Sequence, residues 1–461
     1  MHPISIIYKN VIDNQYRIWY DIFYKQKFRA GGRVLEKPFI FNKITEEVNI
    51  INVPADRFKT SEISISMVLP LKKETASVNA LTAYLLSRSC AKYPDFTLLN
   101  RKLDELYGAS LTASVFKIGE HQSMKLGITA LDDRFSLDGT SISEECAQLL
   151  LDLLFDPRFE EGSFCADDVE MEKRLLIERI KSEENEKRIY AVNRLESEMF
   201  RNEPYRVNRF GTVADVEKIT PDDVLDAWNR MLCTAKVLVT LVGTADSSSI
   251  AQKMKAAFSR VKRAPVPANK TVFIPRAETV NVVEERQEIN QGKLVLGFRV
   301  DMQPDDPMVT AMRSTVDVFG GGPYSRLFMN VREKLSLCYY CNARFVRAKS
   351  MVLVQCGCEE ENMEKAVAEI CAQLKVIQDG GLLQSEFEAS KIGLADAISG
   401  MNDNPEGLEN WYALQMLDEE FLSPEQSCEK NNAVTFDQIT CCAKKITLDT
   451  VYKLMGKKED E

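Results

Sequence analysis

The chain has 461 residues, of which 45% are hydrophobic and 28% are charged, as in an ordinary soluble globular protein. Because this length exceeds what one hydrophobic core usually supports, we expect two domains or more. The formal net charge of −10 argues against a protein that coats nucleic acid or an anionic membrane surface. No window of about 18 consecutive apolar residues occurs, so no transmembrane helix is expected.

The N-terminal part of the chain lacks a clear periodicity, and we interpret residues 1–43 as an extension outside the core. Residues 62–71 alternate apolar and polar side chains, which predicts a half-buried strand. Further strands are expected at 109–115, 123–131 and 236–243, with the first two joined by a turn at Gly119. Helices are expected at 76–90, 96–108, 143–157, 167–201 and 219–232.

The helix expected at residues 219–232 has the strongest start signal. Thr220 is a good N-cap, Pro221 suits the first helical position and Asp223 can complete the cap. The many charged residues between 167 and 201 are instead typical of a solvated helix face.

A proline-rich segment predicts a linker, after which a similar order of elements begins again. Strands are expected at 292–299, 338–346 and 351–358, with helices around them. The motif ITPDDV in the first half matches VTFDQI in the second, at a spacing too long for a solenoid repeat. This indicates a duplicated α+β domain. We assign residues 44–262 to an N-terminal domain, 263–277 to the linker and 278–461 to a C-terminal domain.

The twelve cysteines are scattered along the chain. The closest sets are Cys338 and Cys341, Cys356 and Cys358, and Cys441 and Cys442. They do not form the paired C-x-x-C motifs of a zinc ribbon, and Cys338-x-x-Cys341 alone is a weak signal for metal. We interpret the cysteines as reduced thiols of a cytoplasmic protein. The first residues build no apolar h-region, so no signal peptide is predicted.

Side chains suited to catalysis are scarce. The chain has two histidines, His2 and His121, so it cannot supply the paired imidazoles of an H-E-x-x-H or H-x-x-E-H zinc hydrolase. His2 lies in the extension, and we expect His121, at a strand start beside a turn, to be an ordinary exposed residue. A serine triad would depend on the same His121, and no G-x-S-x-G elbow is present.

The stretch FGGGPYSRLFMNVREKLSLCYY, residues 319–340, contains three consecutive glycines. No Gly-Lys-Ser/Thr follows them, and Pro323 removes a backbone amide that a phosphate would need. We therefore predict a tight turn before a helix rather than a phosphate loop. Arg332 and Tyr339 remain of interest, because a guanidinium and a phenol can both donate hydrogen bonds to a carbonyl or an oxyanion.

From about Val48 to its end the chain resembles the pitrilysin/insulinase family of zinc metallopeptidases, which includes the mitochondrial processing peptidases. In the second half, INQGKLVLGFR and the stretch at 319–340 carry the resemblance. In the first half, LDELYGASLTA, EMEKRLLIERIKSEE and PYRVNRFGTVADVEKITPDDV carry it. The chain looks most like the inactive bacterial homologues that accompany an active peptidase of the family. The resemblance implies two tandem homologous α+β domains, each a mostly antiparallel sheet flanked by helices.

The resemblance also places the family's metal site on this sequence. The two zinc histidines fall on Ala80 and Tyr84, and the general-base glutamate falls on Ala83. Of two family glutamates seven residues apart on a later helix, the first matches Glu172, and the second, which is the remaining zinc ligand, falls on Arg179. Because all four positions are replaced, we expect neither zinc nor hydrolysis from this chain alone.

In the family, an arginine and a tyrosine of the C-terminal domain hold the substrate backbone, and Arg332 and Tyr339 match them. In some bacterial members one polypeptide carries the zinc and another carries the Arg/Tyr pair. The resemblance therefore implies a non-catalytic subunit without a cofactor of its own. It would contribute Arg332 and Tyr339 to the chamber of a homologous zinc-bearing partner that cleaves peptides. An exposed edge strand at 109–115 is a further candidate for binding extended peptide.

Two alternatives remain open. The first is a structural or adaptor protein without a peptidase role. The respiratory-complex core proteins of the family are of this kind, and some bacterial homologues are labelled as associated with elongation factor P modification. The second is an active peptidase with a displaced site.

Overall fold

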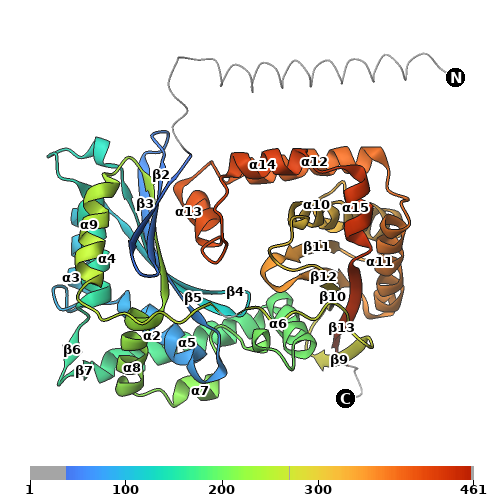
Figure 1. The fold of residues 1–461 in the computed structure, drawn as a ribbon. Coiled ribbons are helices and arrows are strands. Elements are labelled where there is room, and N and C mark those ends of the chain that lie inside the picture. Colours follow the sequence, from blue (N-terminus) through green and yellow to red (C-terminus); the bar gives the residue numbers. More distant parts are fainter. Residues whose placement is uncertain (1–37, 269, 458–461) are drawn as a thin grey trace, which may run out of the picture. The chain divides into compact units, whose positions relative to one another are not determined.

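The computed structural model describes residues 38–268 and 270–457, and from Phe39 onward these residues form one compact unit (Figure 1). His2 and residues 1–37 of the expected extension lie outside the described residues. Residues 40–43 of that extension are part of the fold, because they form most of β1 (Ile40–Thr45), which pairs with β2 (Val48–Pro54). Their side chains are exposed, so they widen the sheet without adding to its core. This explains why the sequence shows no apolar pattern there.

The first sheet has six strands in the order β1-β2-β8-β3-β5-β4. Its other strands are β3 (Thr60–Pro70), β4 (Ser110–Ile118), β5 (His121–Leu131) and β8 (Lys236–Gly243). β2 and β8 are parallel, and every other neighbouring pair is antiparallel. The predicted turn between β4 and β5 contains Gly119, whose φ of 56° lies in the left-handed region that glycine tolerates.

Helices cover the first half of the fold, which runs from β1 to α9, and a short hairpin interrupts them. The helices are α2 (Lys73–Leu86), α3 (Phe96–Glu105), α4 (Ile142–Phe155), α5 (Ala166–Asn185), α6 (Lys187–Met199), α7 (Val213–Glu217), α8 (Pro221–Thr234) and α9 (Ser247–Phe258), with the 3-10 turns η1 (Asp133–Phe135) and η2 (Pro204–Arg206) and the hairpin β6 (Phe159–Glu160) and β7 (Ser163–Phe164). α8 begins as predicted, with a capping box between Thr220 and Asp223. The helix expected at 167–201 is two helices, because the chain leaves helical geometry at Glu186. The Glu186 side chain accepts a hydrogen bond from the Arg188 amide and caps α6.

The second sheet has five strands in the order β11-β12-β10-β13-β9. The strands are β9 (Asn281–Gln287), β10 (Gly292–Val300), β11 (Tyr340–Val346), β12 (Met351–Cys358) and β13 (Ile446–Gly456). The helices of this half are α10 (Val309–Gly320), η3 (Leu327–Lys334), η4 (Arg347–Lys349), η5 (Glu360–Asn362), α11 (Met363–Gln378), α12 (Gln384–Gly400), α13 (Pro405–Ala413), α14 (Pro424–Asn432) and α15 (Phe436–Ala443). β9 and β13 are parallel, and the other neighbouring pairs are antiparallel.

The two sheets have the same construction. The order β9-β13-β10-β12-β11 repeats β2-β8-β3-β5-β4, with one parallel pair at the same place in each. This confirms the predicted α+β fold of two tandem, mostly antiparallel sheets flanked by helices. The domain limits at 44–262, 263–277 and 278–461 stay predictions. The described residues between α9 and β9 form no helix or strand.

Each half contributes a helix to the sheet of the other half. α6 packs against β10 and β13, and α13 packs against β3 and β8 (Figure 1). Leu195 and Met199 of α6 are buried in one apolar cluster with Tyr452 of β13. Tyr412, near the end of α13, is buried in another cluster with Val242 of β8. This reciprocal exchange joins the two halves through apolar surface that each needs to bury.

Buried ion pairs lie at the same junction. Arg299 on β10 donates to Asp449 of β13 at 2.7 Å and to Glu203 at 2.8 Å. The Lys349 ammonium in η4 lies 2.5 Å from Glu120 and 2.6 Å from Glu203. Glu120 and Glu203 come from the first half, whereas both cations come from the second. Removing one partner of such a buried pair typically costs about 3–5 kcal/mol, because it leaves the other charge uncompensated.

His121 is buried at the start of β5, so its predicted exposure was wrong. The turn next to it is covered by the second half of the chain. A Cβ on Gly119 would lie 2.9 Å from the carbonyl oxygen of Ala348. Burial lowers the pKa of His121, which favours the neutral imidazole. The sequence signalled a surface turn, but contact with a segment more than two hundred residues away leaves no local pattern.

Glu62 on β3 gives the fold a pH-dependent contribution. Its side chain is buried near Glu409 of α13 and accepts a hydrogen bond from Thr129. Burial is the largest of the causes that raise the pKa of Glu62 from 4.5 to about 7, and the negative charge of Glu409 also raises it. Between about pH 4.5 and pH 7, Glu62 of the folded chain holds a proton that it releases in the unfolded chain. The contribution of Glu62 to the free energy of unfolding is therefore full below about pH 4.5 and falls as the pH rises through about 7.

Substitution Glu62→Gln should remove this pH-dependent loss. Relative to wild type, we expect the free energy of unfolding of the variant to rise by up to about 3 kcal/mol between about pH 4.5 and pH 8. Urea denaturation at a series of pH values measures the difference. Glu217→Gln, at an exposed position on α7, serves as the control and should follow the wild type. Parallel pH profiles of Glu62→Gln and wild type would mean that Glu62 is ionised in the folded chain.

Candidate functional site

The positions that match the family's zinc site lie on two packed helices, α2 and α5. Ala80 and Ala83 of α2 are completely buried, and their methyl groups cannot coordinate a metal. Tyr84, one turn after Ala80, packs against Phe210 and faces Arg179 of α5. Burial raises the pKa of the Tyr84 phenol, so this side chain stays protonated and does not act as an anionic ligand.

Arg179 supplies the positive charge beside Glu172 that a metal ion would otherwise supply. Its guanidinium donates to Glu172 Oε1 at 2.7 Å and lies 3.8 Å from the centroid of the Tyr84 ring. Arg88 donates to the other oxygen of Glu172 at 3.3 Å. Glu172 is 1% exposed, so the two arginines compensate a carboxylate that would be costly to bury alone. Residues seven apart on α5 lie on one face, which is why Glu172 and Arg179 meet.

The residues at this site do not fit zinc. The four matched positions provide two methyl groups, a protonated phenol and a guanidinium, and none of these is a zinc ligand in proteins. The one carboxylate beside them, that of Glu172, is already paired with two cations. We therefore assign no metal and no catalytic step to the α2–α5 site.

The glycine run forms the predicted turn between α10 and η3. Gly320 lets α10 approach β11, because a Cβ there would lie 2.6 Å from the Cβ of Ala343. η3 is a π-helix, and the amide of Leu335 donates to the carbonyl of Asn330, five residues back. π-helical geometry is rare in proteins, and its commonest form, a single-turn bulge, is frequent at functional sites.

Arg332 lies on η3, and Tyr339 directly precedes β11. The Arg332 guanidinium lies 4.6 Å from the Phe328 ring and 3.6 Å from the carboxylate of Glu333. Tyr339 is 61% exposed and donates to Glu359 Oε1 at 3.0 Å. This hydrogen bond to an anion raises the pKa of Tyr339 and keeps the phenol a donor.

Arg332 and Tyr339 line one pocket of about 520 Å³. Its other lining residues are Glu333, Ser336, Leu337, Cys338, Glu359 and Asn362. The structure thus brings the predicted substrate-binding pair together. Every lining residue belongs to the second half, so the pair does not share this pocket with the four degenerate zinc-site positions.

A cluster of three thiols adjoins the same pocket, and the sequence did not identify it. The sulfur atoms of Cys338, Cys341 and Cys356 lie within 4.8 Å of one another. Hydrogen bonds from the thiols of Cys341 and Cys356, with a smaller effect of the Arg332 charge, lower the pKa of Cys338. The signal in the sequence was the weak Cys338-x-x-Cys341 motif. The third cysteine joins only because β11 and β12 pair with Cys341 opposite Cys356.

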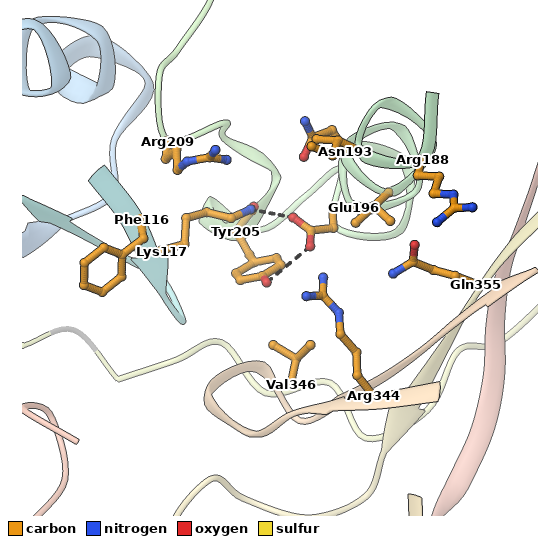
Figure 2. Close-up of a pocket in the computed structure, with 12 residues that line it drawn as sticks. Phe116, Lys117, Arg188, Asn193, Glu196, Tyr205, Arg209, Arg344, Val346 and Gln355 are labelled. Atoms are coloured by element: carbon orange, nitrogen blue, oxygen red, sulfur yellow. Dashed lines mark hydrogen bonds and ion pairs between the residues drawn. The ribbon is translucent and has the colours of Figure 1, made fainter. Parts of the chain in front are cut away.

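A second pocket, of about 410 Å³, is lined by residues of both halves. Lys117 on β4 donates to Glu196 of α6 at 2.6 Å and lies 3.9 Å from the centroid of the Tyr205 ring. Figure 2 shows Arg344 of β11 directed toward the same carboxylate and phenol, with Arg209 on the far side of Lys117's ammonium group. The pocket therefore holds more cationic than anionic side chains. β4 and β11 are also the edge strands of their sheets, so the pocket opens beside unpaired strand edges.

The chain is similar to proteins of one peptidase family. A family model described as "Peptidase M16 inactive domain" matches residues 218–394. Over 404 residues the chain is 29% identical to the "Probable inactive metalloprotease YmfF" of Bacillus subtilis, a match that covers 88% of this chain and 95% of that relative.

Two solved structures share the fold. A conserved protein from Enterococcus faecalis has a TM-score of 0.82 and 26% identity, and the match covers 92% of this chain and 100% of that one. A peptidase M16 inactive domain from Pseudomonas fluorescens has a TM-score of 0.72 and 17% identity, with 92% and 99% covered.

These matches confirm the resemblance to the pitrilysin/insulinase peptidases, which the matching family model describes as M16. Together with the replaced metal ligands, they support the prediction that the chain is an inactive homologue of these peptidases. They support the expectation that the α2–α5 site holds no catalytic zinc. Among the described residues, no helix combines the length and the apolar character needed to cross a membrane.

Removing Arg179 should reveal the cost of burying Glu172. In Arg179→Ala, Glu172 keeps only its longer contact with Arg88, and Tyr84 loses the cation on its ring. We expect the free energy of unfolding to fall by about 1–3 kcal/mol, as measured by urea denaturation. Arg174→Ala, on the exposed side of α5, is the matched control and should change it by less than about 0.5 kcal/mol. Equal effects of the two substitutions would contradict an internal role for Arg179.

Proposed function

We propose that this chain is the non-catalytic subunit of a bacterial zinc metallopeptidase pair in the cytoplasm, whose homologous zinc-bearing partner hydrolyses peptides. The chain contributes Arg332 and Tyr339 as substrate-binding residues to the partner's chamber. One observation carries the proposal. The chain's own metal position is closed by Arg179, whereas Arg332 and Tyr339 lie together in an open pocket. Such a chain can act on a peptide bond only through a second polypeptide that supplies the metal.

Arg332 and Tyr339 are lightly engaged within the chain, which supports this role. The carboxylate nearest to Arg332 is that of its neighbour Glu333 at 3.6 Å, and both side chains are more than two-fifths exposed. Exposed pairs of this kind contribute about 0–1 kcal/mol. Among the described residues, the phenol of Tyr339 has one hydrogen bond, to Glu359 on the wall of the same pocket. Both groups can therefore turn to a peptide carbonyl at small cost and stabilise charge that develops on it.

The unpaired strand edges support a peptide as the substrate. β4 and β11 each end a sheet, and both contribute residues to the pocket of about 410 Å³. An extended peptide can add to such an edge through main-chain hydrogen bonds. Lys117, Arg209 and Arg344 at this pocket favour carboxylate groups on the bound segment. These features give a binding surface for peptide but no hydrolytic group.

The test combines this chain with a zinc-bearing homologue that has both metal histidines and lacks the Arg/Tyr pair. Mixing the purified proteins should give peptide cleavage that neither shows alone. We expect Arg332→Ala to lower kcat/KM of the mixture by roughly 10²–10³-fold, because one charged donor to the reacting carbonyl is lost. Tyr339→Phe should lower it by about tenfold. Cleavage of a fluorogenic peptide measures both.

Two controls separate substrate contact from assembly. Arg101→Ala changes an exposed arginine on α3 and should leave the rate unchanged. Gel filtration should show that Arg332→Ala and Tyr339→Phe still form the complex. If both variants assemble and cleave at the wild-type rate, the pair does not bind substrate. If the assembled mixture cleaves no peptide, an adaptor role without peptidase chemistry becomes the better explanation.

A further inference from the structure

The thiol cluster beside the Arg332 pocket is built from two strands and one loop. Cys341 on β11 lies directly opposite Cys356 on β12. Cys338 precedes β11 and approaches the pair from the segment that follows η3. The sulfur atoms of the three residues all lie within 4.8 Å of one another. Within residues 38–268 and 270–457, they form the one group of three or more His, Cys, Asp or Glu side chains whose ligand atoms lie this close together.

This spacing suits one metal ion. Three sulfur ligands at the usual Zn–S distance of about 2.3 Å lie roughly 4 Å from one another in trigonal or tetrahedral geometry. The backbone that carries two of them is fixed by sheet pairing, so only small side-chain rotations are needed. The cysteines also need no new loop closure, because the fold has already brought them together.

Burial and access are both appropriate for a bound ion. Cys356 and Cys341 are 0% and 4% exposed, so two ligands are shielded from water. Cys338 is partly exposed and lines the pocket of about 520 Å³, which gives the ion a path and leaves room for water as a fourth ligand. Arg332 lines the same pocket and interacts electrostatically with Cys338. Its positive charge would offset the excess negative charge of three thiolates around a divalent ion.

We propose that Cys338, Cys341 and Cys356 bind one thiophilic d10 cation, of which Zn(II) is the representative. An all-sulfur ligand set selects such soft cations over Mg²⁺ or Ca²⁺, which prefer oxygen. Each thiol that binds releases its proton to solvent, and no electron is transferred. The site is separate from the degenerate α2–α5 site, and its role is structural. The ion fixes residue 338 to the sheet and thereby orients the segment from Arg332 to Tyr339.

The experiment uses the full-length chain, reduced, stripped with a chelator and then dialysed against limiting Zn(II). After gel filtration, metal analysis should find about one zinc ion per chain in wild type. Cys338→Ser should bind zinc at least tenfold more weakly. Losing a residue that only hydrogen-bonds to a metal ligand already lowers affinity by about tenfold or more, and losing a ligand itself should cost at least as much. Cys371→Ser, at a cysteine of α11 with the same partial exposure, is the matched control and should retain the ion.

A second measurement needs no substitution. Co(II) added to the stripped wild-type chain should give the sulfur-to-metal charge-transfer absorption of thiolate ligands, and zinc should displace it. Zinc should also slow alkylation of Cys338 by iodoacetamide at least tenfold. The proposal is overturned if wild type and Cys338→Ser retain equal zinc, if Co(II) shows no thiolate absorption, or if the cluster only forms a disulfide on oxidation. Since no peptidase partner is present, these results do not depend on the proposed function.

Discussion

The buried charges between the two halves are the constraint on which the rest of the structure depends. Glu203 of the first half is shared by Arg299 and Lys349 of the second, and Lys349 also binds Glu120. These groups are too deeply buried for water to replace a lost partner. Neither half can therefore leave the other without exposing apolar surface and stranding a charge. The exchange of α6 and α13 between the sheets adds apolar contact to the same junction.

This junction decides where the two pockets lie. It holds the edge strands β4 and β11 at one basic pocket, and it leaves the pocket of Arg332 and Tyr339 within the second half. The chain therefore presents two open pockets, while Arg179 occupies the position that matches the family's metal site. At that position the guanidinium of Arg179 supplies a positive charge, as a metal ion would, but it cannot activate a water molecule. It compensates Glu172, but it offers no coordination position for water.

Much of the fold and part of the site could be predicted from the sequence. Local signals were sufficient for the capped start at Thr220, the turn at Gly119 and the three strands β10, β11 and β12 of the second half. The replaced ligands at Ala80 and Tyr84 stay predictions that rest on the family resemblance, since neither residue type signals a lost metal site without it. Local signals failed where a distant segment decides the environment. His121 looks like a surface residue beside a turn until the second half covers that turn.

The sequence by itself determined the duplicated α+β fold. Through the family resemblance it also predicts the replaced zinc ligands and the substrate-binding pair Arg332 and Tyr339, because motif matches depend on residue type and spacing along one chain. Only the tertiary structure decided that Arg179 neutralises Glu172, and that Cys356 joins Cys338 and Cys341. These contacts arise from helix packing and strand register. Both bring together side chains whose separation in the sequence carries no periodic signal.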